Sequence, residues 1–196
     1  MVEFKIGVIA LQGDVSEHVD AMERALCDKG SIVQVKRAGI VPGCSGLVLP
    51  GGESTTLSRL LAKTGIDQEI KSAAASGVPL LATCAGLVLV SRIIQGDSKV
   101  SPLGLIDTTI GRNVFGSQRE SFEADLDVVG FDRPFRAIFI RAPAIVSAGK
   151  GVSVLARVEE NAVAARQKNV LCLAFHPELT DDLRFHRLFL DTVGVS

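Results

Sequence analysis

The sequence predicts a three-layer α/β fold, in which helices flank a mostly parallel central sheet. In the first half of the 196 residues, short apolar runs alternate with amphipathic stretches, the pattern β-α-β-α-β-α. Several of these runs are almost continuously apolar, as parallel strands covered on both faces are. Glycine or other small residues follow two of them, at the carboxyl ends of strands where such sheets bind ligands.

The composition is that of one globular domain spanning residues 1–196, because 47% of the residues are apolar and 22% are charged. The formal net charge is −1, and the chain has no Trp and no Tyr. Charge therefore gives no basis for binding nucleic acid or an anionic membrane, and aromatic stacking on bases is poorly supported. We expect neither partner.

The four cysteines, at positions 27, 44, 84 and 172, have no paired short spacing. This argues against a zinc site and against a disulfide framework, so we expect reduced thiols and a cytoplasmic location. The apolar run at residues 6–11 is cut off by Gln12-Gly13-Asp14. A signal peptide or a membrane span would need a longer run.

The first strand is expected at residues 4–10, before a tight loop at residues 11–14. Asp14 and Glu17 have the spacing of an N-cap signature, so a helix begins here and ends near Gly30 after a basic last turn. Apolar residues at helical spacing predict the face that packs on the sheet: Val15, Val19, Met22, Ala25 and Leu26.

The second and third strands are expected at residues 32–35 and 46–50, on either side of a loop containing Gly and Pro. The third strand runs straight into Gly51 and Gly52, which let backbone N–H groups approach a ligand closely. Ser54 or Thr55 then caps a helix that continues to about residue 62. A further helix covers residues 66–75 before Gly77 ends it.

The fourth strand follows Pro79 and passes into an apolar helical run across Cys84, without a loop. Small neighbours permit the sharp turn of a nucleophile elbow, and the N-terminus of the following helix favours the reactive thiolate. A buried cysteine acting as a small hydrophobe is the alternative, and this segment alone does not separate the two. The Gly51–Gly52 turn at a second strand end favours the elbow, because a core cysteine would not require it.

The second half is less regular, and it contains no repeat, no low-complexity tract and no linker. Strands are expected at residues 104–110, 121–129, 136–140, 153–158 and 169–175. An amphipathic helix at residues 183–193 closes the chain.

A thiol nucleophile needs a base, and the base needs an orienting group. His18 and His186 lie inside predicted helices and are interpreted as solvated. His176 ends a strand and precedes a proline, so it and Glu178 are expected to point the same way along an extended segment. Taken alone, a strand-end histidine beside a surface glutamate is the better interpretation. When the elbow cysteine and the glycine turn are considered as well, a catalytic role for His176 and Glu178 is favoured.

With Thr83-Cys84-Ala85-Gly86 and His176-Pro177-Glu178, the chain resembles class I (triad) glutamine amidotransferases. More narrowly, nearly its full length resembles the glutaminase subunits of pyridoxal 5'-phosphate synthases. Gly111 and Cys172 depart from the common pattern, and neither is a triad position. The further strings that carry the resemblance are residues 11–14, 50–56, Arg112-Asn113-Val114-Phe115-Gly116 with Gln118, 121–123, 139–143 and 175–180.

The resemblance implies a class I glutamine amidotransferase-like (flavodoxin-like) fold that hydrolyses L-glutamine to L-glutamate and ammonia. Cys84 would be the nucleophile, His176 the general acid and base, and Glu178 the residue that orients the imidazole. Backbone N–H groups of Gly52 and Ala85 would form the oxyanion hole. Gln12 is a candidate for a partner-dependent adjustment of that turn. The implied substrate contacts are Gly51, Gly52, Glu53, Arg112, Ile140 and Arg141.

Ammonia released into water near neutral pH becomes mostly ammonium, which is not nucleophilic, so a partner is expected to receive it directly. The resemblance implies that this partner is the pyridoxal 5'-phosphate synthase subunit, in a hetero-oligomeric complex, and that the chain needs no metal and no organic cofactor. Two alternatives stay open. One is a sibling triad glutaminase serving another synthase, and the other is a non-catalytic regulatory or docking subunit on the same fold.

Overall fold

The computed structural model describes residues 4–112, 114–115 and 120–195. Asn113, Gly116 and Gln118, which carry part of the resemblance, lie outside these residues. The helices are α1 (Val15–Leu26), α2 (Ser54–Thr64), α3 (Ile66–Ala75), α4 (Ala85–Val90) and α5 (Arg184–Val193), with 3-10 turns η1 (Val41–Gly43) and η2 (Pro177–Leu179). The strands are β1 (Phe4–Ile9), β2 (Gly30–Val35), β3 (Gly46–Leu49), β4 (Leu80–Thr83), β5 (Ser91–Ile94), β6 (Ile106–Gly111), β7 (Ser121–Leu126), β8 (Phe135–Ile140), β9 (Ala144–Ala148), β10 (Ser153–Val158), β11 (Asn161–Gln167) and β12 (Val170–Leu173).

Within the described residues, one large sheet has the order β2-β1-β3-β4-β12-β11-β9-β6-β5, with β10 paired to β11. From β2 to β12, all neighbouring strands run parallel. Beyond β12 the neighbours are antiparallel as far as β6. Strands β7 and β8 form a separate hairpin. The α/β fold with a mostly parallel centre is therefore confirmed, and the second half extends the sheet in mixed fashion.

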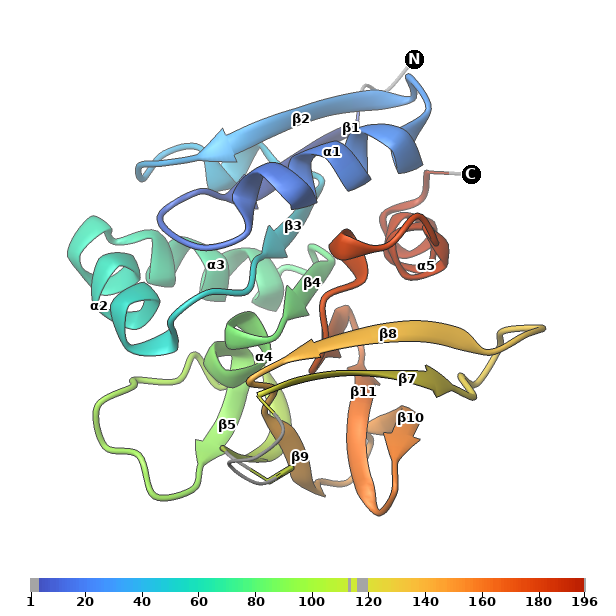
Figure 1. Ribbon diagram of the computed structural model, residues 1–196. Coiled ribbons are helices and arrows are strands. Elements are labelled where there is room, and N and C mark those ends of the chain that lie inside the picture. The colour runs from blue at the N-terminus through green and yellow to red at the C-terminus, as the bar shows by residue number, and fades with distance from the viewer. Residues whose placement is uncertain (1–3, 113, 116–119, 196) are drawn as a thin grey trace.

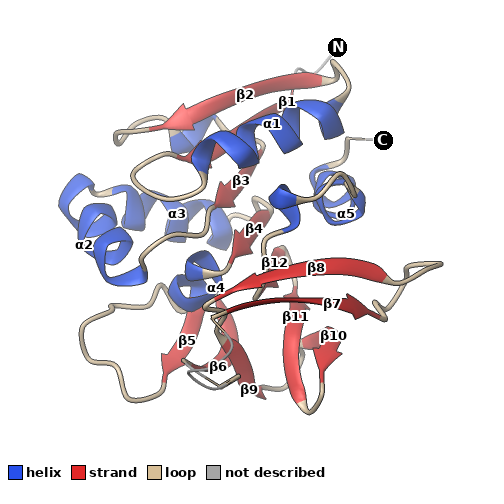
Figure 2. Ribbon diagram, in the orientation of Figure 1, coloured by secondary structure: helices blue, strands red, loops and turns tan. Residues whose placement is uncertain are grey.

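Helices cover the parallel part of the sheet on both faces. Figure 1 shows α2 and α3 on one side of β3 and β4, and α5 beside α1 on the other. Every residue of β3, β4 and β12 is buried, which explains why these runs carry hardly any polar side chains. Figure 2 shows that the mixed end of the sheet, from β11 to β5, carries strands and loops in place of such helices.

The first helix ends earlier than the sequence predicted. It stops at Leu26, and Cys27 itself takes the left-handed conformation at φ 47°. Gly30 is not the helix stop but the first residue of β2. A Cβ atom there would lie 2.3 Å from the carbonyl oxygen of Phe4, so the close approach of β1 explains this glycine.

The region after Cys84 also differs from the prediction. Helix α4 is only six residues long, and Ser91 begins β5 directly after it. The sequence interpretation also missed β9 and β11. Strand β11 contains three alanines within its seven residues, NAVAARQ, so it lacks the β-branched pattern by which strands are recognised.

Among the residues that the structure describes, no helix combines the length and the apolar character that a membrane span requires.

Candidate active site

Three neighbouring strands bring the predicted site residues to one edge of the sheet. Strand β4 pairs in parallel with β3 on one side and with β12 on the other. Gly51, Cys84 and His176 follow these strands closely in the chain, so they emerge at the same edge. Cys84 and His176 border a cavity of about 900 Å³, as does Gly52, the neighbour of Gly51. Its walls include Gln12, Asp14, Gly52, Glu53, Cys84, Ala85, Asp97, Arg112, Ile140, Arg141 and His176.

Cys84 occupies a strained turn between β4 and α4, with φ 48° and ψ −105°. A non-glycine residue at positive φ is uncommon and typical of functional sites. Its N–H donates to the carbonyl of Leu173 at 2.8 Å, which ties the turn to β12. A Cβ atom at Gly86 would lie 2.2 Å from the Leu49 carbonyl oxygen, so only glycine lets α4 approach β3 this closely. The predicted elbow geometry is present.

His176 and Glu178 meet as expected, although the backbone between them is not extended. Glu178 lies in the 3-10 turn η2, and its Oε1 is 2.7 Å from His176 Nδ1. Both residues are buried, at 4% and 5% exposure. With Nδ1 engaged by Glu178, Nε2 is the ring nitrogen left for a thiol. The N–H of His176 donates to the Ile138 carbonyl at 2.9 Å, which fixes its backbone against β8.

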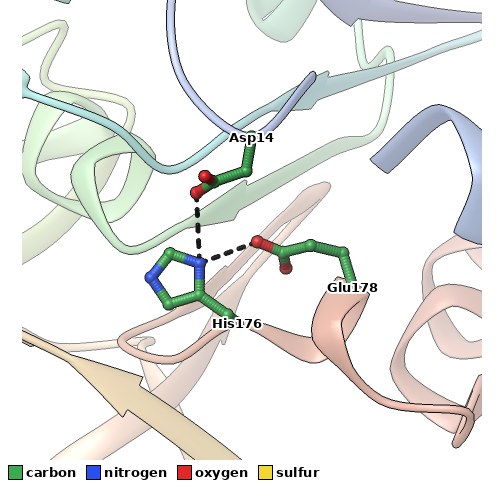
Figure 3. Close-up of side chains that lie close together, drawn as sticks. All are labelled: Asp14, His176 and Glu178. Atoms are coloured by element: carbon green, nitrogen blue, oxygen red, sulfur yellow. Dashed lines mark hydrogen bonds and ion pairs between the residues drawn. The ribbon is translucent and has the colours of Figure 1, made fainter. Parts of the chain in front are cut away.

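Asp14 also approaches the imidazole, which the sequence interpretation did not foresee. Its Oδ2 lies 3.3 Å from His176 Nδ1, so two carboxylates face one ring nitrogen (Figure 3). Asp14 does occupy the N-cap position of α1, but its side chain makes no capping hydrogen bond. The helix therefore begins where the N-cap signature predicted, but the capping hydrogen bonds are absent, because the Asp14 carboxylate points to His176 and Glu17 accepts from the Ser16 hydroxyl.

The charges of this cluster stabilise the imidazolium. Burial lowers the pKa of His176, but hydrogen bonds with Asp14, Cys84 and Glu178 outweigh burial and raise the pKa well above 6.5. Burial has the opposite effect on Glu178 and raises its pKa. The neighbouring His18 and His176 outweigh burial, so the pKa of Glu178 is lowered overall. A protonated His176 is therefore the favoured state near neutral pH.

Glu53 caps the second helix, a role the sequence interpretation gave to Ser54 or Thr55. Its carboxylate accepts from the N–H groups of Thr55 at 3.0 Å and Thr56 at 2.6 Å. Hydrogen bonding by Thr56 contributes most to lowering the pKa of Glu53 to about 2, and Thr55 adds to it against a smaller effect of burial. A glutamate was overlooked because Ser, Thr, Asp and Asn are the common caps.

The loop at residues 12–14 lies directly against the Gly51–Gly52 turn. The Asp14 N–H approaches the Gly51 carbonyl oxygen at 3.4 Å, and the Glu53 N–H donates to Gln12 Oε1 at 2.9 Å. A Cβ atom at Gly13 would lie 1.8 Å from the Gly51 oxygen. The turn that holds one predicted oxyanion donor, Gly52, is thus fixed from behind by this loop.

The remaining predicted substrate residues lie on the far wall of the cavity. Arg112 pairs with Asp97, and its other terminal nitrogen is 2.5 Å from Ser54 Oγ. The carbonyl of Ile140 lies 3.9 Å from Cys84 Sγ. Arg141 follows with φ 43°, and its N–H donates to the Glu120 carbonyl at 2.6 Å. Asp97 was not identified from the sequence, because nothing in its surroundings marks it.

His18 and His186 are both fully buried, so their interpretation as solvated residues is wrong. His18 Nε2 lies 2.9 Å from Thr83 Oγ1 and 3.3 Å from Glu178 Oε2. The rings of the two histidines are 6.3 Å apart. Both lie at the interface where α1 packs against α5. Polarity was mistaken for exposure, because buried imidazoles are uncommon.

Replacing His186 with leucine should make the protein less sensitive to acid. Burial contributes most to lowering the pKa of His186 to about 4, and the neighbouring His18 lowers it further. A depressed histidine pKa stabilises the fold above the unfolded value near 6.5, and this stability is lost as pH falls toward 4. The difference in pKa between about 6.5 and about 4 is worth at most roughly 3–4 kcal/mol of unfolding free energy, at about 1.4 kcal/mol per pKa unit. Urea unfolding at neutral and acid pH measures it.

One result would contradict this prediction for His186. If the wild type and His186→Leu lose the same free energy of unfolding between neutral and acid pH, the buried imidazole does not contribute to acid sensitivity. Cys172→Ala is the matched control, because it also changes a fully buried side chain but removes no group that titrates between neutral and acid pH.

Comparison with known proteins agrees with this geometry. Residues 8–195 match the SNO glutamine amidotransferase family. A "Pyridoxal 5'-phosphate synthase subunit PdxT" from Methanothrix thermoacetophila is 63% identical over 187 residues, covering 95% of this chain and 98% of that protein. The protein of the same name from Methanosarcina acetivorans is 60% identical over 197 residues, covering 96% and 98%.

A solved structure described as a glutamine amidotransferase superposes with a TM-score of 0.90 at 42% identity, covering 96% of this chain and 98% of that one. The likeness extends over nearly the whole length of both chains. The chain therefore belongs to the SNO glutamine amidotransferase family.

Proposed function

We propose that this chain hydrolyses L-glutamine to L-glutamate and ammonia and supplies the ammonia for pyridoxal 5'-phosphate synthesis. The observation that carries the proposal is Cys84 at a strained strand–helix elbow, in one cavity with His176, whose Nδ1 is 2.7 Å from Glu178. Membership of a glutamine amidotransferase family supports the amide substrate. The names of relatives at 60% and 63% identity support the pathway.

The chemistry begins with attack of the Cys84 thiolate on the side-chain carboxamide carbon of glutamine. The oxyanion that forms is stabilised by backbone N–H groups, for which Ala85 and Gly52 are the candidates. His176 then gives its proton to the departing nitrogen, so that ammonia leaves and a glutamyl thioester remains. The same imidazole takes a proton from water, which attacks the thioester and releases glutamate. Glu178 keeps the imidazole in one orientation throughout.

Recognition of free glutamine requires partners for its α-ammonium and α-carboxylate groups. We assign these to the cavity walls, where Glu53 carries negative charge and Arg112 and Arg141 carry positive charge. Gly51, Gly52 and Ile140 would contribute backbone contacts. Asp97 pairs with Arg112 in the free protein, so glutamine has to share or displace this carboxylate.

Replacing Glu53 by asparagine should separate its capping role from substrate binding. Asparagine is an equally good cap, so the melting temperature should stay close to that of the wild type. Loss of a charge-assisted bond to the substrate amine should raise KM for glutamine by roughly 10- to 100-fold. Glu53→Ala should raise KM equally but also lower stability by about 1 kcal/mol. An unchanged KM in both variants would remove Glu53 from the substrate site.

The proposed partner is a pyridoxal 5'-phosphate synthase subunit, because free ammonia is protonated in water near neutral pH. The test measures ammonia release from L-glutamine by the purified chain, with and without that subunit. Release that appears or rises sharply with the subunit supports both the reaction and the partner. Strong release without it keeps the reaction and counts against the partner. No release under either condition favours a docking subunit and overturns the proposal.

A further inference from the structure

The carboxylate of Glu178 is held from two sides by histidines on different elements. Its Oε1 lies 2.7 Å from His176 Nδ1, and its Oε2 lies 3.3 Å from Nε2 of His18, a residue of α1. The side chains of His18 and Glu178 have no solvent exposure. His18 Nε2 is also 2.9 Å from the hydroxyl oxygen of Thr83, the residue directly before Cys84. Helix α1, strand β4 and turn η2 therefore meet at one buried imidazole.

The chemistry of the carboxylate fixes the tautomer of His18. A carboxylate oxygen only accepts hydrogen bonds, so an unprotonated Nε2 facing Oε2 would bring two lone pairs together. Nε2 must therefore carry the proton, shared between Thr83 Oγ1 and Glu178 Oε2. At 3.3 Å the interaction with Oε2 is longer than an ordinary hydrogen bond, so its contribution is mainly electrostatic.

Oε2 of Glu178 has no hydrogen-bond partner among the described residues. The electrostatic contact with His18 Nε2 is therefore important for keeping this carboxylate oxygen buried. A buried carboxylate oxygen that faces only apolar groups is strongly disfavoured. Without His18, Glu178 would rotate or take up a proton, and it would then hold His176 Nδ1 less well. Asp14 is already 3.3 Å from that nitrogen and would compete for it. The imidazole would turn away from its position opposite Cys84.

We propose that His18 is a positioning residue of the active site, which together with Thr83 fixes the Glu178 carboxylate so that Oε1 accepts from His176 Nδ1. This inference rests on the proposed glutaminase function. His18 does not contact the substrate cavity, so it acts on the reaction only through Glu178. The competing explanation is that His18 merely fills space between α1 and α5.

Four variants separate the two explanations. His18→Leu removes the donor, and His18→Asn keeps an amide that is too short to reach Oε2. His18→Gln places an amide N–H₂ group near the position of Nε2. His186→Leu is the matched control, because it removes a second fully buried imidazole, which makes no hydrogen bond in the described structure. Each is assayed with the synthase subunit over a range of glutamine concentrations and pH.

We expect His18→Leu and His18→Asn to lower kcat by about 10- to 100-fold, as loss of an outer-shell partner does, with KM nearly unchanged. The pH profile of kcat/KM should shift in both. His18→Gln should recover most of the activity, and His186→Leu should match the wild type. In the isolated chain, the downfield proton resonance of His176 Nδ1–H should persist in His18→Gln and weaken or move in His18→Asn.

The inference would be overturned if His18→Leu and His18→Asn kept the kcat and the pH profile of the wild type. Equal losses in His18→Leu and His186→Leu would also overturn it, since these would show a packing effect. If His18→Leu does not fold, the comparison of His18→Gln with His18→Asn decides alone, and equal activities overturn the proposal. A wild type that releases no ammonia would instead refute the proposed function, and the proton resonance would still test the role of His18.

Discussion

Cys84→Ala should abolish ammonia release from L-glutamine in the presence of the synthase subunit, by a factor on the order of 10⁴ to 10⁶ in kcat. The thioester cannot form without the sulfur, and water is a poor substitute in a site built for a covalent intermediate. The fold should remain intact, because alanine keeps the Cβ atom and tolerates the backbone of the elbow about as well as cysteine does. An ammonium assay, with circular dichroism for the fold, measures both.

Cys172→Ala and Cys27→Ser are the controls for this result. Cys172 is fully buried in β12, and burial raises the pKa of its thiol to about 12. It should therefore affect stability and leave turnover nearly unchanged, and the exposed Cys27 should affect neither. If Cys84→Ala kept its ammonia release, or if Cys172→Ala lost as much, the assignment of the nucleophile would be wrong.

Gly13→Ala should damage both stability and catalysis. An alanine Cβ atom would lie 1.8 Å from the Gly51 carbonyl oxygen, at a φ of +103° that L-residues rarely adopt. The Gly51–Gly52 turn would have to move, and with it the proposed oxyanion donor. Loss of one such donor costs about 10²- to 10³-fold in kcat. Overpacking costs a further 1–3 kcal/mol or so in unfolding free energy, which thermal unfolding measures.

Gly39→Ala is the control for Gly13→Ala, because it introduces the same kind of backbone strain without a steric clash. Gly39 has a similar φ of +89°, but a Cβ atom there would meet nothing within 4 Å. Gly39→Ala should therefore lower the unfolding free energy by only about 1–2 kcal/mol, the cost of the left-handed conformation for alanine. Its kcat should equal that of the wild type. Equal kcat values for the two variants would mean that the loop at residues 12–14 does not fix the glycine turn.

The parallel half of the fold could be predicted from the sequence because its strands are apolar runs that end near glycine residues. Each of β1 to β4 was anticipated, and so was the convergence of the Gly51–Gly52 turn, through Gly52, with Cys84 and His176. The mixed half was harder, because β5 follows α4 without a break and β11 is rich in alanine. There, tertiary pairing decides the conformation over local propensity.

The two buried histidines show where the helix analysis failed. His18 lies three residues after Val15 and four before Met22, so its spacing already placed it on the inner stripe of α1. His186 lies three residues before Phe189 and four before Leu190, so it also falls on the inner stripe of its helix, α5. Position along the helix was the better guide, and side-chain polarity the misleading one. Which carboxylates meet which imidazoles depends on contacts between distant segments, and no local pattern encodes them.

The position of β12 in the sheet also has a consequence for the order in which the proposed site can form during synthesis. This strand comes late in the sequence but inserts between β4 and β11, next to the strand that ends at Cys84. Until β12 has been translated, the chain lacks His176 and Glu178, and it also lacks the Leu173 carbonyl that ties the Cys84 turn to the sheet. Incomplete or truncated chains should therefore lack the proposed base, and the proposed hydrolysis of glutamine should begin only after the last strand has docked.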